Sequence, residues 1–175
     1  MPFGDQLARF GIHGMAASAG RGFSPGPGAR LMDLGGALGR ALPLICYEAV
    51  FPQDIAAAPE RPDFLLQITN DAWFGELSGP YQHLAQARLR AVEQGLPMVR
   101  VANTGVSAMI DGRGRVVASL ALNTTGIIDA ALPPALDPPL YARIGDWPLL
   151  GLLLLGLGFM IFMRIRGIDA VPGSP

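Results

Sequence analysis

Seventeen consecutive residues near the end of the chain, residues 147–163, carry no charge and are mostly leucine and other apolar types. As a helix rising about 1.5 Å per residue, this run spans roughly 25 Å, slightly less than a hydrocarbon core of about 30 Å. Flanking side chains can reach the interface and make up the difference. The alternative is a buried core helix, but no polar face is left on the run for a soluble fold. The sequence therefore predicts a transmembrane helix over residues 147–163.

The charges beside this run predict its orientation. Arg164 and Arg166 follow it directly, whereas on its other side Arg143 is offset by Asp146. Basic residues near a membrane helix favour the cytoplasmic side. We therefore expect residues 164–175 to form a cytoplasmic tail and residues 1 to about 140 to lie outside the inner membrane.

The composition agrees with membrane contact and excludes nucleic-acid binding. Only 15% of the residues are charged, against roughly 25% in an average soluble domain. The net charge is −1, and the thirteen basic residues are spread thinly, so no electrostatic footprint for nucleic acid exists. All thirteen are arginines, and the chain contains no lysine.

The only cysteine of the chain, Cys46, lies in the apolar run of residues 41–52, with Glu48 two residues further on. This run predicts a short buried strand that Pro52 ends, with Cys46 near its carboxyl end, where open α/β sheets bind ligands. If the strand continues, alternation places Cys46 and Glu48 on one face. A lone cysteine in such a run is otherwise typical of a small core residue. A free thiol with a pKa of about 8.5 is mostly protonated at neutral pH, so a nucleophilic cysteine needs a partner that takes its proton. The carboxylate of Glu48 is close by in the sequence.

The segment around the cysteine resembles the nucleophile segment of the nitrilase superfamily, and the residues that carry the likeness are Ile45, Cys46, Tyr47, Glu48, Phe51 and Pro52. Members of that superfamily form an acyl-enzyme with a Glu, Lys and Cys triad. Soluble nitrilases and amidases usually carry aspartate at position 48. Glutamate there is similar to the apolipoprotein N-acyltransferases of bacterial envelopes.

Three further segments resemble the same family, namely residues 70–75 (Asn-Asp-Ala-Trp-Phe-Gly), residues 103–107 and the entry into the apolar helix. Residues 2–5 resemble a Pro-Phe-Gly-Glu stretch that follows the catalytic lysine, with Asp5 in place of the glutamate. The triad lysine and glutamate would lie before residue 1. We therefore expect the chain to be the C-terminal portion of a longer protein and to be inactive alone.

The resemblance implies an α/β fold, the C-terminal part of a nitrilase-like α-β-β-α sandwich over residues 1–135, followed by a linker over residues 136–146 and the membrane helix. The pattern predicts strands over residues 64–70, 98–102, 106–110 and 115–120, with a short one within residues 29–34. It predicts a loop over residues 53–63 and a helix over residues 81–94 that Gly95 ends.

The resemblance also assigns candidate residues. Cys46 would be the nucleophile, the backbone N–H of Tyr47 would help to hold the oxyanion, and Tyr47 and Glu48 would shape the pocket, with Asp5 as a supporting acid. The substrate-binding candidates are Asn70, Trp73 and Phe74. Asn70 would hold a backbone or a substrate carbonyl, and the two rings would cover a pocket, enter lipid or pack on the core. His83 is interpreted as structural.

The reaction that the resemblance implies takes an acyl chain from a membrane phospholipid onto the cysteine as a thioester. The N-terminal amine of an apolipoprotein's diacylglyceryl-cysteine then attacks this thioester and takes over the acyl group. The partners would be the phospholipid, the apolipoprotein, the membrane and the missing N-terminal half, with no metal or organic cofactor. The place would be the bacterial inner membrane, with the catalytic part facing the periplasm. A membrane-tethered amidase and a non-catalytic remnant are the alternatives.

Overall fold

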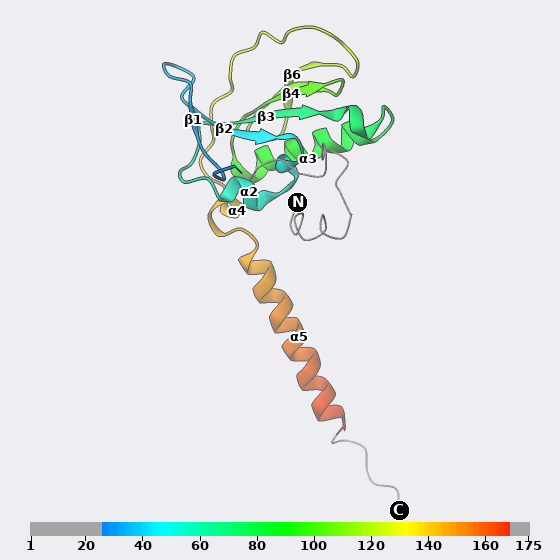
Figure 1. The fold of residues 1–175 in the computed structure, drawn as a ribbon. Helices are drawn as coiled ribbons and strands as arrows, with labels where there is room; N and C mark the ends of the chain where they lie inside the picture. Colours follow the sequence, from blue (N-terminus) through cyan, green and yellow to red (C-terminus); the bar gives the residue numbers. More distant parts are fainter. Residues whose placement is uncertain (1–25, 169–175) are drawn as a thin grey trace, which may run out of the picture.

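A computed structural model describes residues 26–168, which form a six-stranded mixed sheet, helices packed against it and a long helix at the C-terminal end (Figure 1). The strands are β1 (Met32–Asp33), β2 (Arg40–Ile45), β3 (Phe64–Asn70), β4 (Met98–Asn103), β5 (Ser107–Ile110) and β6 (Val116–Leu120). The helices are α2 (Pro52–Ala56), α3 (Gly79–Gln94), α4 (Leu140–Ile144) and α5 (Trp147–Ile168), with the short 3-10 helices η2 (Cys46–Val50) and η3 (Asp71–Phe74).

The strands follow one another across the sheet in chain order. The central strands β2, β3 and β4 run parallel, and the outer strands β1, β5 and β6 pair antiparallel to their neighbours. Because parallel strands end at the same edge of a sheet, β2 and β3 deliver η2 and η3 side by side. Cys46 and the Asn70–Phe74 segment therefore lie at the same edge of the sheet.

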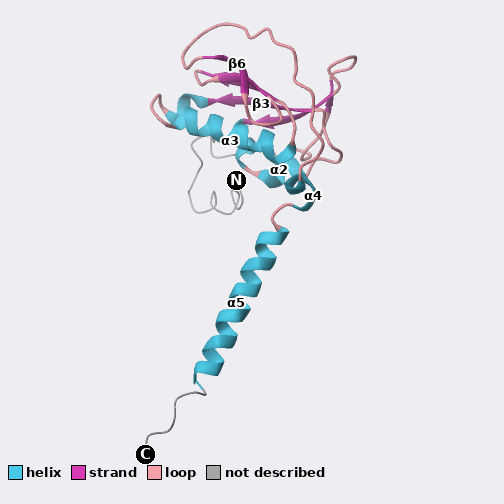
Figure 2. Ribbon diagram, turned by 180° about the vertical axis from the view of Figure 1, so that it is seen from behind, coloured by secondary structure: helices cyan, strands magenta, loops and turns pink. Residues whose placement is uncertain are grey.

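Helices α2 and α3 cover one face of the sheet (Figure 2). Leu42, Leu44 and Leu65 of the sheet are buried there together with Ala87 and Ala91 of α3. The two alanines let the helix approach the strands closely, since neither carries a long side chain. Helix α3 ends at Gly95, whose φ of 62° is the left-handed conformation that glycine adopts without strain, as the sequence predicted.

Truncating Leu65 to alanine is expected to lower the free energy of unfolding by about 2–5 kcal/mol. Its side chain is fully buried, and the surroundings relax only partly around the cavity left behind. Leu77→Ala makes the same chemical change at a residue that is 91% exposed, and should cost less than about 0.5 kcal/mol. Denaturant titration of both variants measures the difference, and equal losses would contradict this core assignment.

The face of the sheet turned away from α3 carries a row of apolar side chains across the three parallel strands. Ile45, Ile68 and Val101 are paired in register and are 55%, 48% and 50% exposed. Scattered apolar residues are ordinary on a surface, but a contiguous row is typical of a surface that packs against another layer.

The structure differs from the sequence predictions mainly around Cys46. Strand β2 ends at Ile45, and the chain turns there into η2, so the expected strand through residue 51 was wrong. Part of the expected loop over residues 53–63 is helix α2, because Pro52 not only stops a strand but also suits the first turn of a helix. Within residues 136–146, for which the sequence predicts a linker, α4 forms a short helix.

Helix α5 projects away from the rest of the chain (Figures 1 and 2). Its residues Trp147–Arg166 have a mean hydropathy of 2.1, and none of this span is buried. By length and composition the helix is long and apolar enough to cross a membrane, and it extends beyond the uncharged run to Ile168. An apolar helix that the described residues leave unburied needs another apolar environment around it.

Candidate active site

Cys46 begins η2 directly after the last residue of β2, at the carboxyl edge of the parallel strands. Its thiol is free and partly exposed. Its backbone has a φ of 53°, which residues with a Cβ rarely adopt. The expected place of the cysteine at a strand's carboxyl end is confirmed, and the positive φ is the feature that bends the chain out of the sheet.

Glu48 does not share a strand face with Cys46, because the strand stops before both residues. Its carboxylate instead turns back to accept a hydrogen bond from the backbone N–H of Ile45 at 2.6 Å. This bond closes the first turn of η2. Glu48 therefore stabilises the bend that carries the cysteine, and the alternation argument for this pair was wrong.

Aromatic rings gather beside this bend. Tyr47 lies 5.5 Å from Phe51 and 6.5 Å from Phe74, measured between ring centroids, and Phe74 meets the ring of His83 edge-on at 5.3 Å. Tyr47 is about half exposed, so the cluster lines the surface next to the thiol. Such rings offer an apolar surface with polar tips.

The other two substrate-binding candidates lie on the neighbouring segment. Trp73 is 62% exposed. The side-chain oxygen of Asn70 accepts the backbone N–H of Ala72 at 3.1 Å, which caps η3. Asn70 therefore holds the backbone of its own loop, one of the two roles expected from the sequence. Asp5 lies outside the described residues.

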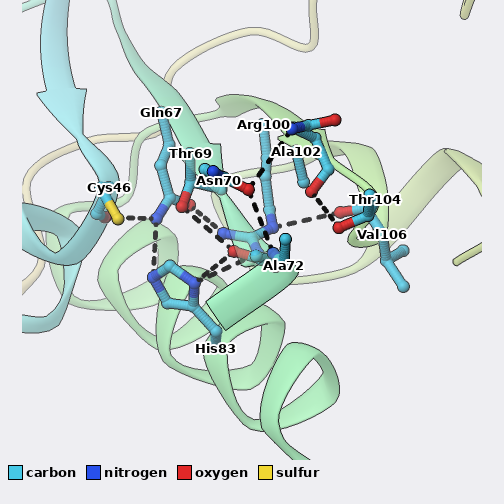
Figure 3. A network of polar contacts seen from close by, with 12 residues as sticks. Cys46, Gln67, Thr69, Asn70, Ala72, His83, Arg100, Ala102, Thr104 and Val106 are labelled. Carbon is cyan, nitrogen blue, oxygen red and sulfur yellow. Dashed lines mark hydrogen bonds and ion pairs between the residues drawn. The ribbon is translucent and has the colours of Figure 1, made fainter. Parts of the chain in front are cut away.

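Behind the cysteine lies a buried polar network (Figure 3). Its members come from β3, β4, η3 and α3 and are all less than 7% exposed: Gln67, Thr69, Asp71, His83 and Arg100. A guanidinium nitrogen of Arg100 donates to Asp71, and another donates to the amide oxygen of Gln67. The amide nitrogen of Gln67 donates to the backbone carbonyl of Cys46 at 3.1 Å. The network therefore reaches the candidate nucleophile directly.

The charges inside this network compensate one another. Burial opposes ionisation of Asp71, but the hydrogen bond from His83 and the charge of Arg100 outweigh it and hold the pKa of Asp71 below its usual value. Burial lowers the pKa of Arg100, and Asp71 works against that shift. A carboxylate and a guanidinium thus form a buried ion pair close to the thiol.

The turn after β4 packs on this ion pair. Arg100 Nε donates to the carbonyl of Val106 at 3.1 Å. Gly105 lies so close to the carboxylate of Asp71 that a Cβ at this position would collide with it. The resemblance placed residues 103–107 near the active site, and the structure does bring this turn onto the network.

Sequence reasoning did not find Gln67, Asp71 and Arg100 as members of one site, and it took His83 only as structural. The available signal was a polar residue inside each of two apolar strands. Gln67 and Arg100 pair directly across β3 and β4, but that register is set by packing and cannot be read from either strand alone.

The carbon-nitrogen hydrolase family matches residues 22–136 of the chain. An apolipoprotein N-acyltransferase from Bradyrhizobium diazoefficiens is 48% identical over 166 residues, 95% of this chain and 30% of that protein. Another from Rhodopseudomonas palustris is 54% identical over 133 residues, 76% of this chain and 24% of that protein. The chain thus spans less than a third of the length of these curated relatives. Among solved structures, an amidase from a Nesterenkonia species is 25% identical, with a TM-score of 0.46, over 58% of this chain and 40% of the amidase.

Proposed function

Because the chain belongs to the carbon-nitrogen hydrolase family, we propose that it supplies the nucleophile of an apolipoprotein N-acyltransferase. The observation that carries this proposal is a free thiol at a bend with positive φ, at the carboxyl edge of parallel strands, in a chain about half identical to relatives with that name. The substrates would be a membrane phospholipid and the diacylglyceryl-cysteine at the N-terminus of an apolipoprotein.

The reaction would proceed in two acyl transfers on Cys46. The thiolate attacks an ester carbonyl of the phospholipid, an S–C bond forms, the ester C–O bond breaks, and the lysophospholipid leaves with a proton. The amine of the acceptor then attacks the thioester carbon, an N–C bond forms, and the S–C bond breaks to return the thiol. The backbone N–H of Tyr47 would donate to the oxyanion formed in each step.

A base must take the proton from the thiol, and this chain has no lysine to form a Glu-Lys-Cys triad. We propose that the lysine and the glutamate come from an N-terminal half of the same enzyme. The half-exposed row of Ile45, Ile68 and Val101 would be its docking face, because the second layer of a sandwich needs an apolar surface to cover.

Residues around the thiol would divide the remaining work. Glu48 would hold the bend, Tyr47 and Phe74 would border the acyl chain, and Trp73 would meet lipid, since it is largely exposed. Asn70 would keep the loop that carries the two rings in place. Asp5 stays a proposed supporting acid on the basis of the motif alone.

The proposed setting is the bacterial inner membrane, with α5 as its anchor. An acyl donor and an acceptor that are both lipid-anchored can meet the thiol only at the bilayer surface. The catalytic part, residues 1–135, would face the periplasm, and residues 164–175 would be cytoplasmic, because Arg164 and Arg166 follow the apolar run.

Cysteine labelling is expected to show this orientation. In a Cys46→Ser background, a membrane-impermeant maleimide added to spheroplasts should label Thr125→Cys, an exposed position of the catalytic part. The matched variant Ser174→Cys should be labelled only after lysis. The reversed pattern would contradict the proposed topology, and labelling of both before lysis would contradict a spanning helix.

The experiment that tests the proposed activity uses a chimera in which the chain replaces the matching part of the Bradyrhizobium relative. It receives phospholipid vesicles with or without a diacylglyceryl-cysteine peptide. Acylated peptide is the expected product, dependent on the peptide amine. Release of free fatty acid at the same rate with and without peptide would favour the membrane-tethered amidase. No turnover by a folded chimera would favour the non-catalytic remnant.

A further inference from the structure

The left-handed backbone of Cys46 has to be held by its surroundings, because residues with a Cβ adopt it rarely. Two hydrogen bonds hold it from opposite sides. The carboxylate of Glu48 accepts the N–H of Ile45 before the cysteine, and Gln67 Nε2 donates to the carbonyl of Cys46 after it. The first bond is local to η2, whereas the second comes from a fully buried side chain on the neighbouring strand.

The orientation of the Gln67 amide follows from Arg100. A guanidinium has only donors, so the group that faces Arg100 Nη1 must be the amide oxygen of Gln67. The NH2 group of Gln67 then points to its two other partners, the carbonyl of Cys46 at 3.1 Å and Nε2 of His83 at 3.1 Å. The amide therefore cannot flip without placing its NH2 group against the guanidinium.

The same logic continues around a closed ring of four side chains. Because Nε2 of His83 accepts from Gln67, Nδ1 of the neutral ring carries the proton and donates to Asp71 Oδ1 at 2.9 Å. The second oxygen of Asp71 accepts from Arg100, which closes the ring. Every donor and acceptor role in the ring is thus determined by the arginine.

We propose that Gln67, oriented by Arg100, is a positioning residue that holds Cys46 in the left-handed conformation from which its thiol reacts. Calling Cys46 the nucleophile rests on the proposed function, whereas the conformational claim stands on the hydrogen bonds alone. The glutamine acts through the backbone of Cys46.

The chain contains one cysteine, so labelling with 13C,15N-cysteine gives a single backbone signal in lipid micelles. We expect the wild-type signal to show left-handed shifts and a strong contact between its own N–H and Hα protons. Gln67→Glu keeps an acceptor for Arg100 but removes the donors to Cys46 and His83. The population ratio of left-handed to other conformers should fall about tenfold. Gln82→Glu makes the same change at an exposed position of α3 and should leave the signal unchanged.

A Gln67→Glu chain that keeps the left-handed signature would overturn the proposal. Since glutamate can still pair with Arg100, the proposal also requires the variant to melt cooperatively. If it does not fold, Arg100→Lys, which retains a charge for Asp71 but loses the fork that binds Gln67, must show the loss of signature. Failure of both variants to fold would mean that the ring is a structural element only, and would equally overturn the positioning role.

Activity is measured separately, in the chimera. Gln67→Glu should lower kcat for thioester formation about tenfold with little change in KM, since the substrate surface is untouched. One combined outcome is that Gln67→Glu loses the left-handed signature while the chimera without this substitution is inactive. That outcome would refute the proposed function but support the positioning role. If the chimera is active and Gln67→Glu changes neither the signature nor kcat, the positioning role is refuted and the proposed function is supported.

Discussion

Replacing Asp71 with asparagine is expected to lower the free energy of unfolding by about 3–5 kcal/mol, the range seen when one partner of a buried ion pair is removed. Asp71 is fully buried, and its two oxygens accept from Thr69, His83 and Arg100. An asparagine has one oxygen, so its NH2 group would face a donor, and the charge of Arg100 would be left without a counterion. Chemical denaturation monitored by circular dichroism measures the loss.

Asp129→Asn provides the matched control, because the same change occurs at an exposed position. It should alter the free energy of unfolding by no more than about 0.5 kcal/mol. If Asp71→Asn were as mild as the control, the buried network would contribute little to the stability of the fold.

The difference between wild type and Asp71→Asn should depend on pH. Burial raises the pKa of Asp71, but His83 and Arg100 lower it more, so the folded value lies below the unfolded one. The native state then binds fewer protons than the unfolded state, and the contribution of Asp71 is complete above the unfolded pKa of about 3.9. It is lost as the pH falls through the lower folded pKa. Unfolding titrations at pH 6 and near pH 3 should show the difference shrinking, and a constant difference would contradict the ion pair.

Replacing Cys46 with serine is expected to reduce acyl transfer by the chimera about 10³-fold or more. The substitution replaces the sulfur by an oxygen, so a hydroxyl stands in place of the thiol. Without a base arranged to deprotonate it, a serine hydroxyl is a far weaker nucleophile than a thiolate. The measurement is the rate at which labelled acyl chains appear on a diacylglyceryl-cysteine peptide. Thermal melting should show the fold unchanged, since the sulfur is partly exposed and carries no disulfide.

The control for this variant is Thr125→Ala, which lies on an exposed stretch after β6 and should transfer at the wild-type rate. Residual transfer above about one tenth of wild type in Cys46→Ser would rule out the thioester route. A loss that accompanies unfolding would be assigned to the fold, and Cys46→Ala would then be compared at a temperature where it stays folded.

The family and its α/β fold class could be predicted from the sequence because the segment around Cys46 and residues 70–75 resemble that family. Individual elements rest instead on short runs with strong local signals. The strand Phe64–Asn70 is an apolar run bounded by loops, and Gly95 ends α3 as expected. The long apolar helix near the C-terminal end could likewise be predicted from length and composition alone. These elements depend on periodicity and turn residues, which a chain displays without its partners.

The interior of the candidate site could not be predicted in the same way. No glycine marks the positive φ of Cys46, so the bend into η2 was read as a continuing strand and Glu48 was assigned to the wrong geometry. The ring behind Cys46 depends on the register between β3 and β4 and on where α3 places His83. Tertiary packing sets both, and it overrides local preference.

Whether Cys46 accepts an acyl group is tested most directly by intact mass measurement of the chimera after incubation with phospholipid vesicles and no acceptor. We expect an added mass equal to one acyl group, located on Cys46, absent from Cys46→Ser and removed by hydroxylamine, which cleaves thioesters. Addition of the diacylglyceryl-cysteine peptide should discharge the group onto the peptide amine. A folded chimera that never acquires this mass, or that acquires it equally in Cys46→Ser, would contradict the claim that this chain carries the acyl-accepting thiol.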